Sequence, residues 1–164
     1  MRYRVIVGLA LVAALLDQLS KWAVTARLTA EDCIAVTSFF NLVNVRNHGA
    51  AFGFLNDPSS TWQFWLFAGA TVLATGVIMY VAKSAGEKDR LLFFALGCIL
   101  GGAVGNFIDR VRFRAVVDFL DFHIAGYHWP AFNVADICIC LGAFVAAVFM
   151  LRSPLPKSEK KPLR

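Results

Sequence analysis

One stretch decides the fold class: Phe132-Asn133-Val134-Ala135-Asp136-Ile137-Cys138-Ile139-Cys140-Leu141-Gly142-Ala143-Phe144. It is apolar enough to cross a bilayer, yet a carboxylate lies near its start. A charged side chain inside hydrocarbon costs roughly 2.5–3.5 kcal/mol even on lenient insertion scales, so such residues usually serve a function. A second acid, Asp118, lies upstream in the mostly apolar run 116–122. Two acids at one membrane face indicate acid–base chemistry on a substrate that lies in the membrane.

Three further stretches are long and apolar enough to cross a bilayer, which gives four spans at about residues 5–25, 62–82, 91–109 and 132–152. A helix of about 21 residues is about 31 Å long, close to the roughly 30 Å thickness of the hydrocarbon core. The composition agrees, because 59% of the 164 residues are hydrophobic and only 16% are charged. The sequence therefore predicts an all-α membrane protein with a single four-span domain over residues 1–152.

The first span has an alternative interpretation. Arg2 and Arg4 precede an apolar run, and Val12-Ala13-Ala14 could serve as a cleavage site, so the segment also resembles a secretory signal peptide. Three more spans follow, and a retained helix can pack against them. We therefore favour a retained helix.

The basic residues set the expected orientation. Ten of the 16 lie before the first span, between the second and third, or after the fourth, so the positive-inside rule places both termini in the cytoplasm. The other six fall on the outer side: Lys21, Arg27, Arg46, Arg110, Arg112 and Arg114. The last three form a cluster with two interpretations, binding of acidic lipid headgroups or a solvated interfacial face. Cytoplasmic loops also explain the net charge of +5, and no basic stripe interleaved with aromatic residues indicates nucleic-acid binding.

Two outer segments are expected, at about residues 26–61 and 110–131, and residues 153–164 read as a disordered basic cytoplasmic tail. Residues 38–45 are rich in β-branched and aromatic side chains, and Asn47-His48-Gly49 suits a turn. The first segment therefore predicts a small extracytoplasmic β-sheet. The second is expected to form a short extracytoplasmic loop or helix.

The cysteines and histidines do not predict a metal site. Cys138 and Cys140 are two residues apart on a predicted helix, so they point to different sides and cannot clamp one ion. His123 and His128 read as interfacial residues without a role, and Asp121 as a solvated acid. No metal or other cofactor is expected.

Polar residues gather where the predicted spans end on the outer side. The pairs Asn106/Asp109 and Asn133/Asp136 are spaced i,i+3, and Asp17/Lys21 is spaced i,i+4, so each pair shares one helix face. For Asp17/Lys21 and Asp109/Arg110, a structural network that holds helices together is an equal alternative to a functional role. Gly97, Gly101 and Gly105 form a small-residue stripe for close helix packing, and we expect Gly105 also to make room for a substrate backbone.

Five motifs then resemble bacterial lipoprotein signal peptidase (signal peptidase II), in that family's order and across all four spans. They are Asp17-Gln18-Leu19-Ser20-Lys21, Asn47-His48-Gly49-Ala50-Ala51-Phe52, Gly105-Asn106-Phe107-Ile108-Asp109-Arg110, Val116-Val117-Asp118-Phe119 and Phe132-Asn133-Val134-Ala135-Asp136. His48 departs from the small or hydroxyl residue often found at its position.

The resemblance implies an aspartic endopeptidase of the bacterial inner membrane with its active site at the extracytoplasmic face. Its substrates would be prolipoproteins whose cysteine carries diacylglyceryl, cleaved N-terminal to that cysteine, and globomycin would block it. Asp118 and Asp136 match the catalytic pair. Supporting or substrate-binding roles fall on Asp17, Lys21, Asn47, Gly49, Gly105, Asn106, Asp109, Arg110, Asn133 and Ala135.

Three other classes remain as alternatives from the residues alone. A cation-coupled transporter would place acids near the bilayer midplane and show a repeat, neither of which the sequence indicates. A metal-dependent lipid-headgroup transferase would carry clustered aspartates, and only Asp118 and Asp121 come near this. In a non-catalytic assembly protein the polar motifs would serve only to hold helices together.

Overall fold

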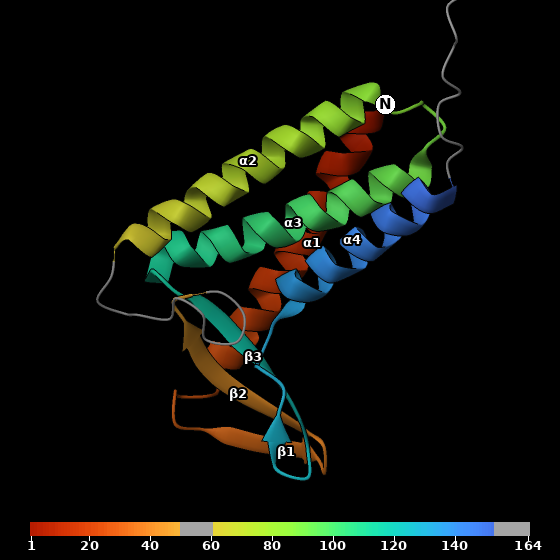
Figure 1. The fold of residues 1–164 in the computed structure, drawn as a ribbon. Coiled ribbons are helices and arrows are strands. Elements are labelled where there is room, and N and C mark those ends of the chain that lie inside the picture. The colour runs from red at the N-terminus through yellow and green to blue at the C-terminus, as the bar shows by residue number, and fades with distance from the viewer. Residues whose placement is uncertain (50–60, 153–164) are drawn as a thin grey trace, which may run out of the picture.

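The computed structural model describes residues 1–49 and 61–152, and its largest elements are four long helices (Figure 1). They are α1 (Arg2–Thr25), α2 (Trp62–Ser84), α3 (Arg90–Phe113) and α4 (Val134–Arg152), and each is long and apolar enough to cross a membrane. The four predicted spans are confirmed, with one useful difference. Helix α3 continues past residue 109 to Phe113, so Asp109 and Arg110 lie inside its last turns. The expected tail at 153–164 lies outside the described residues.

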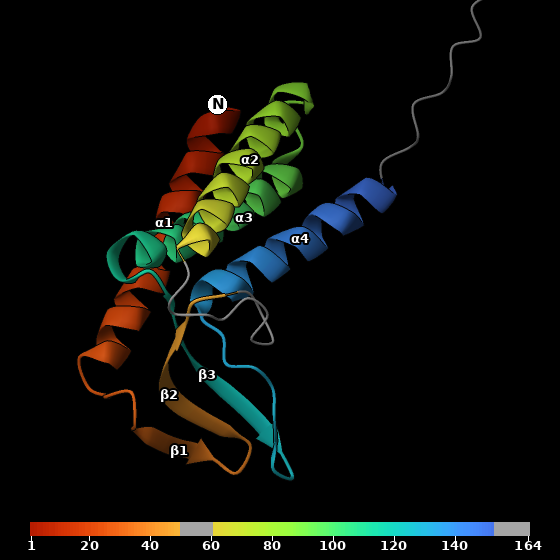
Figure 2. The same ribbon diagram turned by 60° about the vertical axis from the view of Figure 1, so that its left-hand side comes forward.

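Helix α3 is the centre of the helical part. Both α1 and α4 pack along it (Figures 1 and 2). The most apolar 18-residue stretch of α3 is therefore 61% buried, whereas the corresponding stretches of α1 and α4 are 28% and 11% buried. Glycine makes the α1 contact close: a Cβ on Gly101 would lie only 2.6 Å from the Ala10 carbonyl oxygen. The predicted small-residue stripe therefore serves helix packing.

Helix α2 is held mainly at its two ends. Only 6% of its most apolar 18-residue stretch is buried. At its C-terminal end, the Arg2 guanidinium donates hydrogen bonds to the carbonyl oxygens of Ala82, Lys83 and Ala85. These carbonyls would otherwise lack partners at the helix terminus. The rest of α2 presents apolar side chains outward.

A four-stranded antiparallel sheet extends from one end of the helices (Figures 1 and 2). Its strands are β1 (Cys33–Thr37), β2 (Phe40–Asn47), β3 (Val116–Ile124) and β4 (Tyr127–His128), in the order β1-β2-β3-β4. The sheet predicted in the first outer segment is confirmed, and Asn47 ends β2 where a turn was expected. The loop or helix predicted for the second segment is wrong, because residues 116–124 form β3. Their β-branched and aromatic side chains favour an extended strand, and β2 offers a partner.

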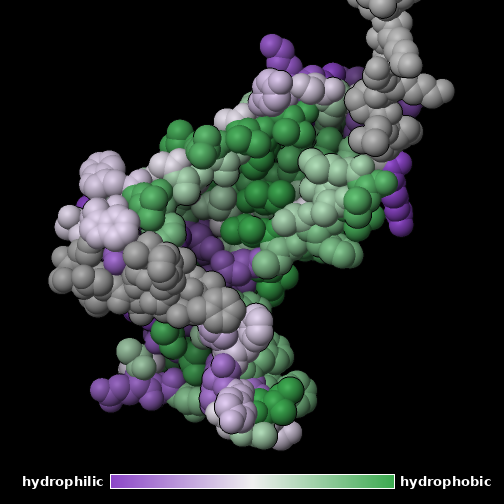
Figure 3. Space-filling view, viewed as in Figure 1, coloured by the Kyte–Doolittle hydropathy of each residue, from purple (hydrophilic) through white to green (hydrophobic). Residues whose placement is uncertain are grey.

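The surface of the helices is hydrophobic along their length and hydrophilic toward both of their ends, as Figure 3 shows. Hydrophilic residues are also visible between the helices and the sheet. This is the arrangement of a membrane-spanning bundle that carries a small sheet at one end.

Candidate active site

A cavity of about 800 Å³ lies where α3 and α4 meet the sheet. Its polar lining comes from Asn47, Asn106, Arg110, Asp118 and Asp136. The remaining wall is largely apolar and comes from β2, β3, α4 and the segment that joins β4 to α4: Val45, Gly49, Val116, Trp129, Pro130, Ala131, Phe132, Ile137, Ile139, Cys140 and Leu141. Both acids singled out in the sequence therefore face one space.

Asp118 is delivered by the sheet. It lies on β3, is only 3% exposed, and accepts hydrogen bonds from the amides of Asn47 (3.0 Å) and Asn133 (2.7 Å). Burial raises the pKa of Asp118 to about 6, and the nearby negative charge of Asp136 acts in the same direction. The two amide hydrogen bonds oppose this rise, but they do not overcome it. Asp118 therefore titrates within reach of neutral pH.

Asp136 is delivered by the first turn of α4. Its Oδ1 accepts a hydrogen bond of 2.8 Å from the Asn106 amide, and its Oδ2 accepts one of 3.2 Å from the backbone N–H of Asn133. Its own backbone N–H donates to Asn133 Oδ1 at 3.0 Å. Asn133 and Asp136 thus form a reciprocal capping pair at the start of α4. Asn106 and Asp109, the other pair with i,i+3 spacing, both contact Lys21.

The Asn133 side chain joins the two acids. It is fully buried, its Oδ1 caps α4 beside Asp136, and its Nδ2 donates to Asp118 and, at 3.2 Å, to Asn106 Oδ1. The Asn133 side chain therefore ties the Asp118 carboxylate to the first turn of α4, which carries Asp136.

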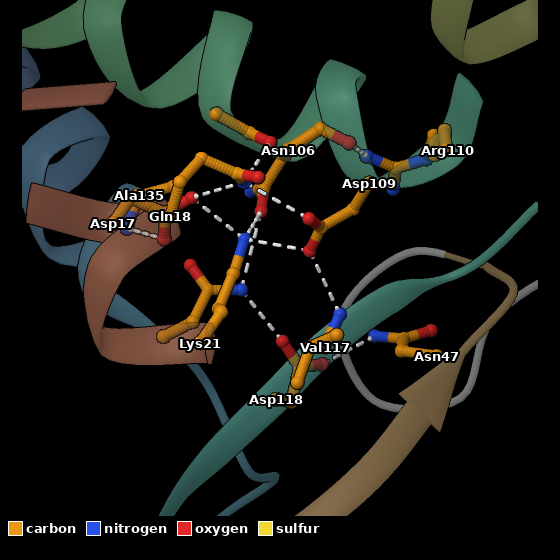
Figure 4. Close-up of polar contacts among 12 residues, drawn as sticks. Asp17, Gln18, Lys21, Asn47, Asn106, Asp109, Arg110, Val117, Asp118 and Ala135 are labelled. Carbon is orange, nitrogen blue, oxygen red and sulfur yellow. Dashed lines mark hydrogen bonds and ion pairs between the residues drawn. The ribbon is translucent and has the colours of Figure 1, made fainter. Parts of the chain in front are cut away.

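A buried cation, Lys21, is hydrogen-bonded to Asn106, which in turn contacts Asp136 (Figure 4). Lys21 Nζ donates to Asp17 at 2.8 Å, Asp109 at 2.9 Å and Asn106 Oδ1 at 3.0 Å, which uses all three of its N–H groups. The bond to Asn106 fixes which end of that amide points toward Asp136. Asp109 also accepts from the backbone N–H of Val117 at 3.0 Å, which ties α3 to β3.

Asp17 anchors α4. Its Oδ1 accepts a 2.9 Å hydrogen bond from the backbone N–H of Ala135, one of the donors left free at a helix start. Gly105 allows this approach, since a Cβ there would lie 2.6 Å from Asp17 Oδ2. The expectation that Gly105 makes room for substrate backbone is therefore wrong: Asp17 occupies that space. Ala135 contributes through its backbone and is fully buried.

Arg110 and Gly49 meet at the rim of the cavity. Arg110 donates to the Gly49 carbonyl oxygen at 3.1 Å, and its guanidinium carbon lies 4.1 Å from the centre of the Phe67 ring. The Gly49 N–H in turn donates to Asn47 Oδ1 at 3.0 Å, which orients the amide that contacts Asp118. The end of β2, the end of α3 and the start of α2 are joined here.

Sequence reasoning missed Gln18. Its amide donates to Asp109 (2.9 Å), to the Gly105 carbonyl (3.1 Å) and to Asp17 (3.2 Å), and so completes the network around Lys21. Gln18 follows Asp17 directly in the sequence, and this position was the only feature that could have indicated its role.

One further expectation on the sheet is wrong. Asp121 is not a solvated acid, because it is only 7% exposed and accepts a 2.9 Å hydrogen bond from Asn41. His128, to which the sequence assigned no role, contacts this acid: its Nδ1 lies 2.9 Å from Asp121 Oδ1. Burial alone would raise the pKa of Asp121, but the bonds from His128 and Asn41 outweigh it and hold the pKa below its usual value. The three-residue spacing turns Asp121 away from Asp118 on the strand, so the two do not form an array.

The chain was then compared with known proteins. Residues 9–152 match the family described as signal peptidase (SPase) II. The lipoprotein signal peptidase of Nitratidesulfovibrio vulgaris is 52% identical over 162 residues, which cover 98% of each chain. That of Oleidesulfovibrio alaskensis is 53% identical and covers 87% of this chain and 92% of its own length. This chain belongs to the signal peptidase II family.

Structure comparison agrees with the family. A solved bacterial membrane enzyme superposes with a TM-score of 0.80 at 29% identity, covering 96% of this chain and 94% of its own. A second solved bacterial membrane enzyme gives a TM-score of 0.78 over 91% of this chain. As a member of the signal peptidase II family, the chain is a membrane-embedded protease that processes prolipoproteins.

Proposed function

We propose that the chain is an aspartic endopeptidase that cleaves prolipoproteins N-terminal to a diacylglyceryl-modified cysteine, with Asp118 and Asp136 as its catalytic pair. The observation that carries this proposal is that both carboxylates line one cavity and are both held by Asn133, Asp118 through the side-chain amide and Asp136 through the backbone N–H. Two neighbouring carboxyl groups resist double ionisation, so the pair shares a proton and can supply a base and an acid at once.

Asp136 suits the role of base. It lies at the N-terminus of α4, where the helix dipole favours a negative charge, and two N–H donors contact its carboxylate. In the ionised form it would take a proton from a water molecule, and the resulting nucleophile would attack the carbonyl carbon of the scissile peptide bond.

Asp118 suits the role of acid. Its pKa of about 6 is already raised by burial, and a bound substrate that displaces water from the cavity would raise it further. Protonated Asp118 would donate to the carbonyl oxygen as the tetrahedral gem-diol forms. As the C–N bond breaks, the proton gained by Asp136 would go to the leaving amine, and a gem-diol hydroxyl would return its proton to Asp118 as it becomes the new carboxyl carbonyl. The pair is thus restored after each cycle.

The apolar wall supports a lipid-modified substrate. Ile137, Cys140 and Leu141 of α4 line the cavity, and Ile137 and Leu141 are each 45% exposed on the outside of the helix. An acyl chain could remain in the bilayer along this face while the peptide reaches the two acids. Asn106 and Arg110 line the same cavity and could bind the peptide backbone, and the cyclic peptide globomycin is proposed to occupy this space.

Lipid dependence tests the proposal. Purified protein is incubated with diacylglyceryl-modified and unmodified prolipoprotein in the presence of EDTA, and products are identified by gel shift and mass spectrometry. We expect cleavage only of the modified form, directly before its lipidated cysteine, because each buried CH₂ adds about 0.8 kcal/mol of membrane anchoring. Equal rates on both forms would refute the substrate assignment, and loss of activity with EDTA would refute metal-independent chemistry.

We further propose that the protein lies in the inner membrane with both termini in the cytoplasm and the sheet outside. The distribution of basic residues supports this orientation. Cys33 is exposed on β1, so an impermeant thiol reagent applied to spheroplasts should label it in a protein whose other three cysteines are replaced by alanine. Under the same conditions a cysteine-free protein carrying Ser158→Cys should stay unlabelled. The reverse pattern would place the site at the cytoplasmic face.

A further inference from the structure

Three arginines at the end of α3 and on β2 stack on aromatic rings outside the cavity. The guanidinium carbons of Arg46 and Arg112 lie 4.5 Å and 4.9 Å from the centre of the Phe113 ring. The guanidinium carbon of Arg114 lies 4.1 Å from the centre of the Phe64 ring. We call these five residues the arginine–phenylalanine patch, and it joins β2, the start of α2 and the end of α3.

The positive charge of the patch is not neutralised within the described part of the chain. No carboxylate of residues 1–49 or 61–152 forms an ion pair with Arg46, Arg112 or Arg114. Arg46 Nη1 is also shielded from water and has no hydrogen-bond partner among those residues. A shielded donor without an acceptor is unfavourable, and so are two guanidinium groups against one ring. Both features are relieved by an anion.

Stacking leaves the arginines suited to phosphate. A guanidinium that lies over a ring directs its N–H donors sideways, in its own plane, where they remain available. Arg112 and Arg114 are exposed, so these donors reach the surface. The planar fork of donors matches the oxygens of a phosphate group. The ring contacts therefore preorganise a phosphate-binding surface.

The position of the patch relative to the membrane identifies the source of the phosphate. Phe64 lies in the first turn of α2 between Trp62 and Trp65, which are 52% and 71% exposed. Exposed tryptophans at a helix end mark the boundary between hydrocarbon and headgroups. Figure 1 shows this start of α2 beside the end of α3, next to the sheet. At that level the surrounding phosphates belong to lipid headgroups.

We propose that the arginine–phenylalanine patch binds the headgroup phosphate of an anionic phospholipid. A net-negative lipid is favoured over a zwitterionic one because no carboxylate of residues 1–49 or 61–152 pairs with these arginines. The bound lipid would hold the end of α3 at a fixed depth, and α3 carries Asn106, which contacts Asp136. This proposal does not depend on the catalytic assignment of either aspartate.

Native mass spectrometry of the full-length protein tests the proposal. Phosphatidylglycerol and phosphatidylcholine with identical acyl chains are titrated separately, and the affinity of the first bound lipid is compared. We expect the protein to prefer phosphatidylglycerol, and R112Q/R114Q to lower its affinity for that lipid by roughly fivefold for each arginine, with little change for phosphatidylcholine. R112K/R114K keeps the charge but loses the planar fork, so its affinity for phosphatidylglycerol should fall between those of R112Q/R114Q and the unmodified protein.

The matched control removes two exposed arginines from the opposite end of the helices. R4Q/R152Q lowers the net charge by the same amount, so it should keep the lipid preference of the unmodified protein. Equal losses in R4Q/R152Q and R112Q/R114Q would show only a general charge effect and overturn the proposal. An absent preference in the unmodified protein would also overturn it, as would its removal by millimolar inorganic phosphate, which would indicate a site for free anions. Thermal unfolding of each variant confirms that the protein measured is folded.

Discussion

Two pairs of buried aspartates lie within one region of this molecule, and their surroundings differ. Asp17 and Asp109 share the ammonium group of Lys21 and also accept hydrogen bonds from Gln18. Asp118 and Asp136 are held by amides and backbone N–H groups, and both face the cavity. The first pair is closed: its two acids form ion pairs with one lysine and neither lines the cavity, so it can position helices but does not reach a substrate. The second pair is open: both acids line the cavity and neither forms an ion pair with a described residue, which suits acid–base chemistry.

The two pairs are linked through the side chain of Asn106. Asn106 receives the third N–H of Lys21 on its oxygen and donates from its nitrogen to Asp136. The closed pair is therefore linked to the open pair through one amide, and Lys21, which does not line the cavity, helps to orient the Asn106 side chain that contacts Asp136.

Replacing either member of the open pair should have the largest effect. Asp118→Asn and Asp136→Asn keep the shape of the side chain but cannot accept or share the proton, so we expect cleavage to fall by about 10³-fold or more. The measurement is turnover of lipid-modified prolipoprotein by purified variants. Thermal unfolding should show that Asp118→Asn remains folded, with at most a modest loss of stability, because one of its two amide contacts becomes a donor facing a donor while a buried charge is removed. Near-normal cleavage by one variant would exclude that residue from the pair.

Replacing the cation of the closed pair should give the opposite phenotype. Lys21→Met leaves two buried carboxylates without their shared partner, and such a loss typically destabilises a protein by about 3–5 kcal/mol. Thermal unfolding in detergent should therefore show a marked fall in Tm. Adding Asp109→Asn to this variant removes one uncompensated charge and should recover part of the loss. An unchanged Tm in Lys21→Met would mean that the closed pair does not hold the helices.

The smallest effect concerns the tuning of the open pair. If Asp118 acts as the acid, kcat/KM should fall as pH rises through a value near 6, where Asp118 loses its proton. The Asn47 amide lowers the pKa of Asp118, so Asn47→Ala should raise that pKa and move the alkaline limb to higher pH. A pH profile of kcat/KM for both proteins measures the shift. Movement toward lower pH would contradict the assignment of Asp118 as the acid.

Much of this arrangement followed from the sequence. Long apolar runs predicted the four helices. The i,i+3 and i,i+4 spacings predicted that Asn106 lies on the same helix face as Asp109, Asn133 on that of Asp136, and Lys21 on that of Asp17. The catalytic candidates stood out because a carboxylate in an apolar run needs a reason to be there. These features are local in the chain, so periodicity and composition reveal them.

Other features depended on contacts between distant segments. The β-branched and aromatic residues of β3 favour a strand, but its partner β2 lies about 70 residues earlier in the chain, and local propensity does not show that these two segments pair. Gln18 is an ordinary polar residue until α3 places Asp109 and the Gly105 carbonyl next to it. Gly105 could be assigned to close packing, but only the fold shows that its neighbour is Asp17 and not a substrate.

The sparse packing of α2 has a consequence for how freely this protein can change over generations. Arg2 holds the C-terminal end of this helix, and arginines stacked on Phe64 and Phe67 hold its N-terminal end. Only 6% of the most apolar 18-residue stretch of α2 is buried. Outward-facing positions in α2 need only to be compatible with acyl chains, whereas Gly101 in α3 tolerates almost no added atom. Selection should therefore leave α2 as a region of rapid sequence drift among apolar residues, next to a neighbouring helix whose small residues are nearly fixed.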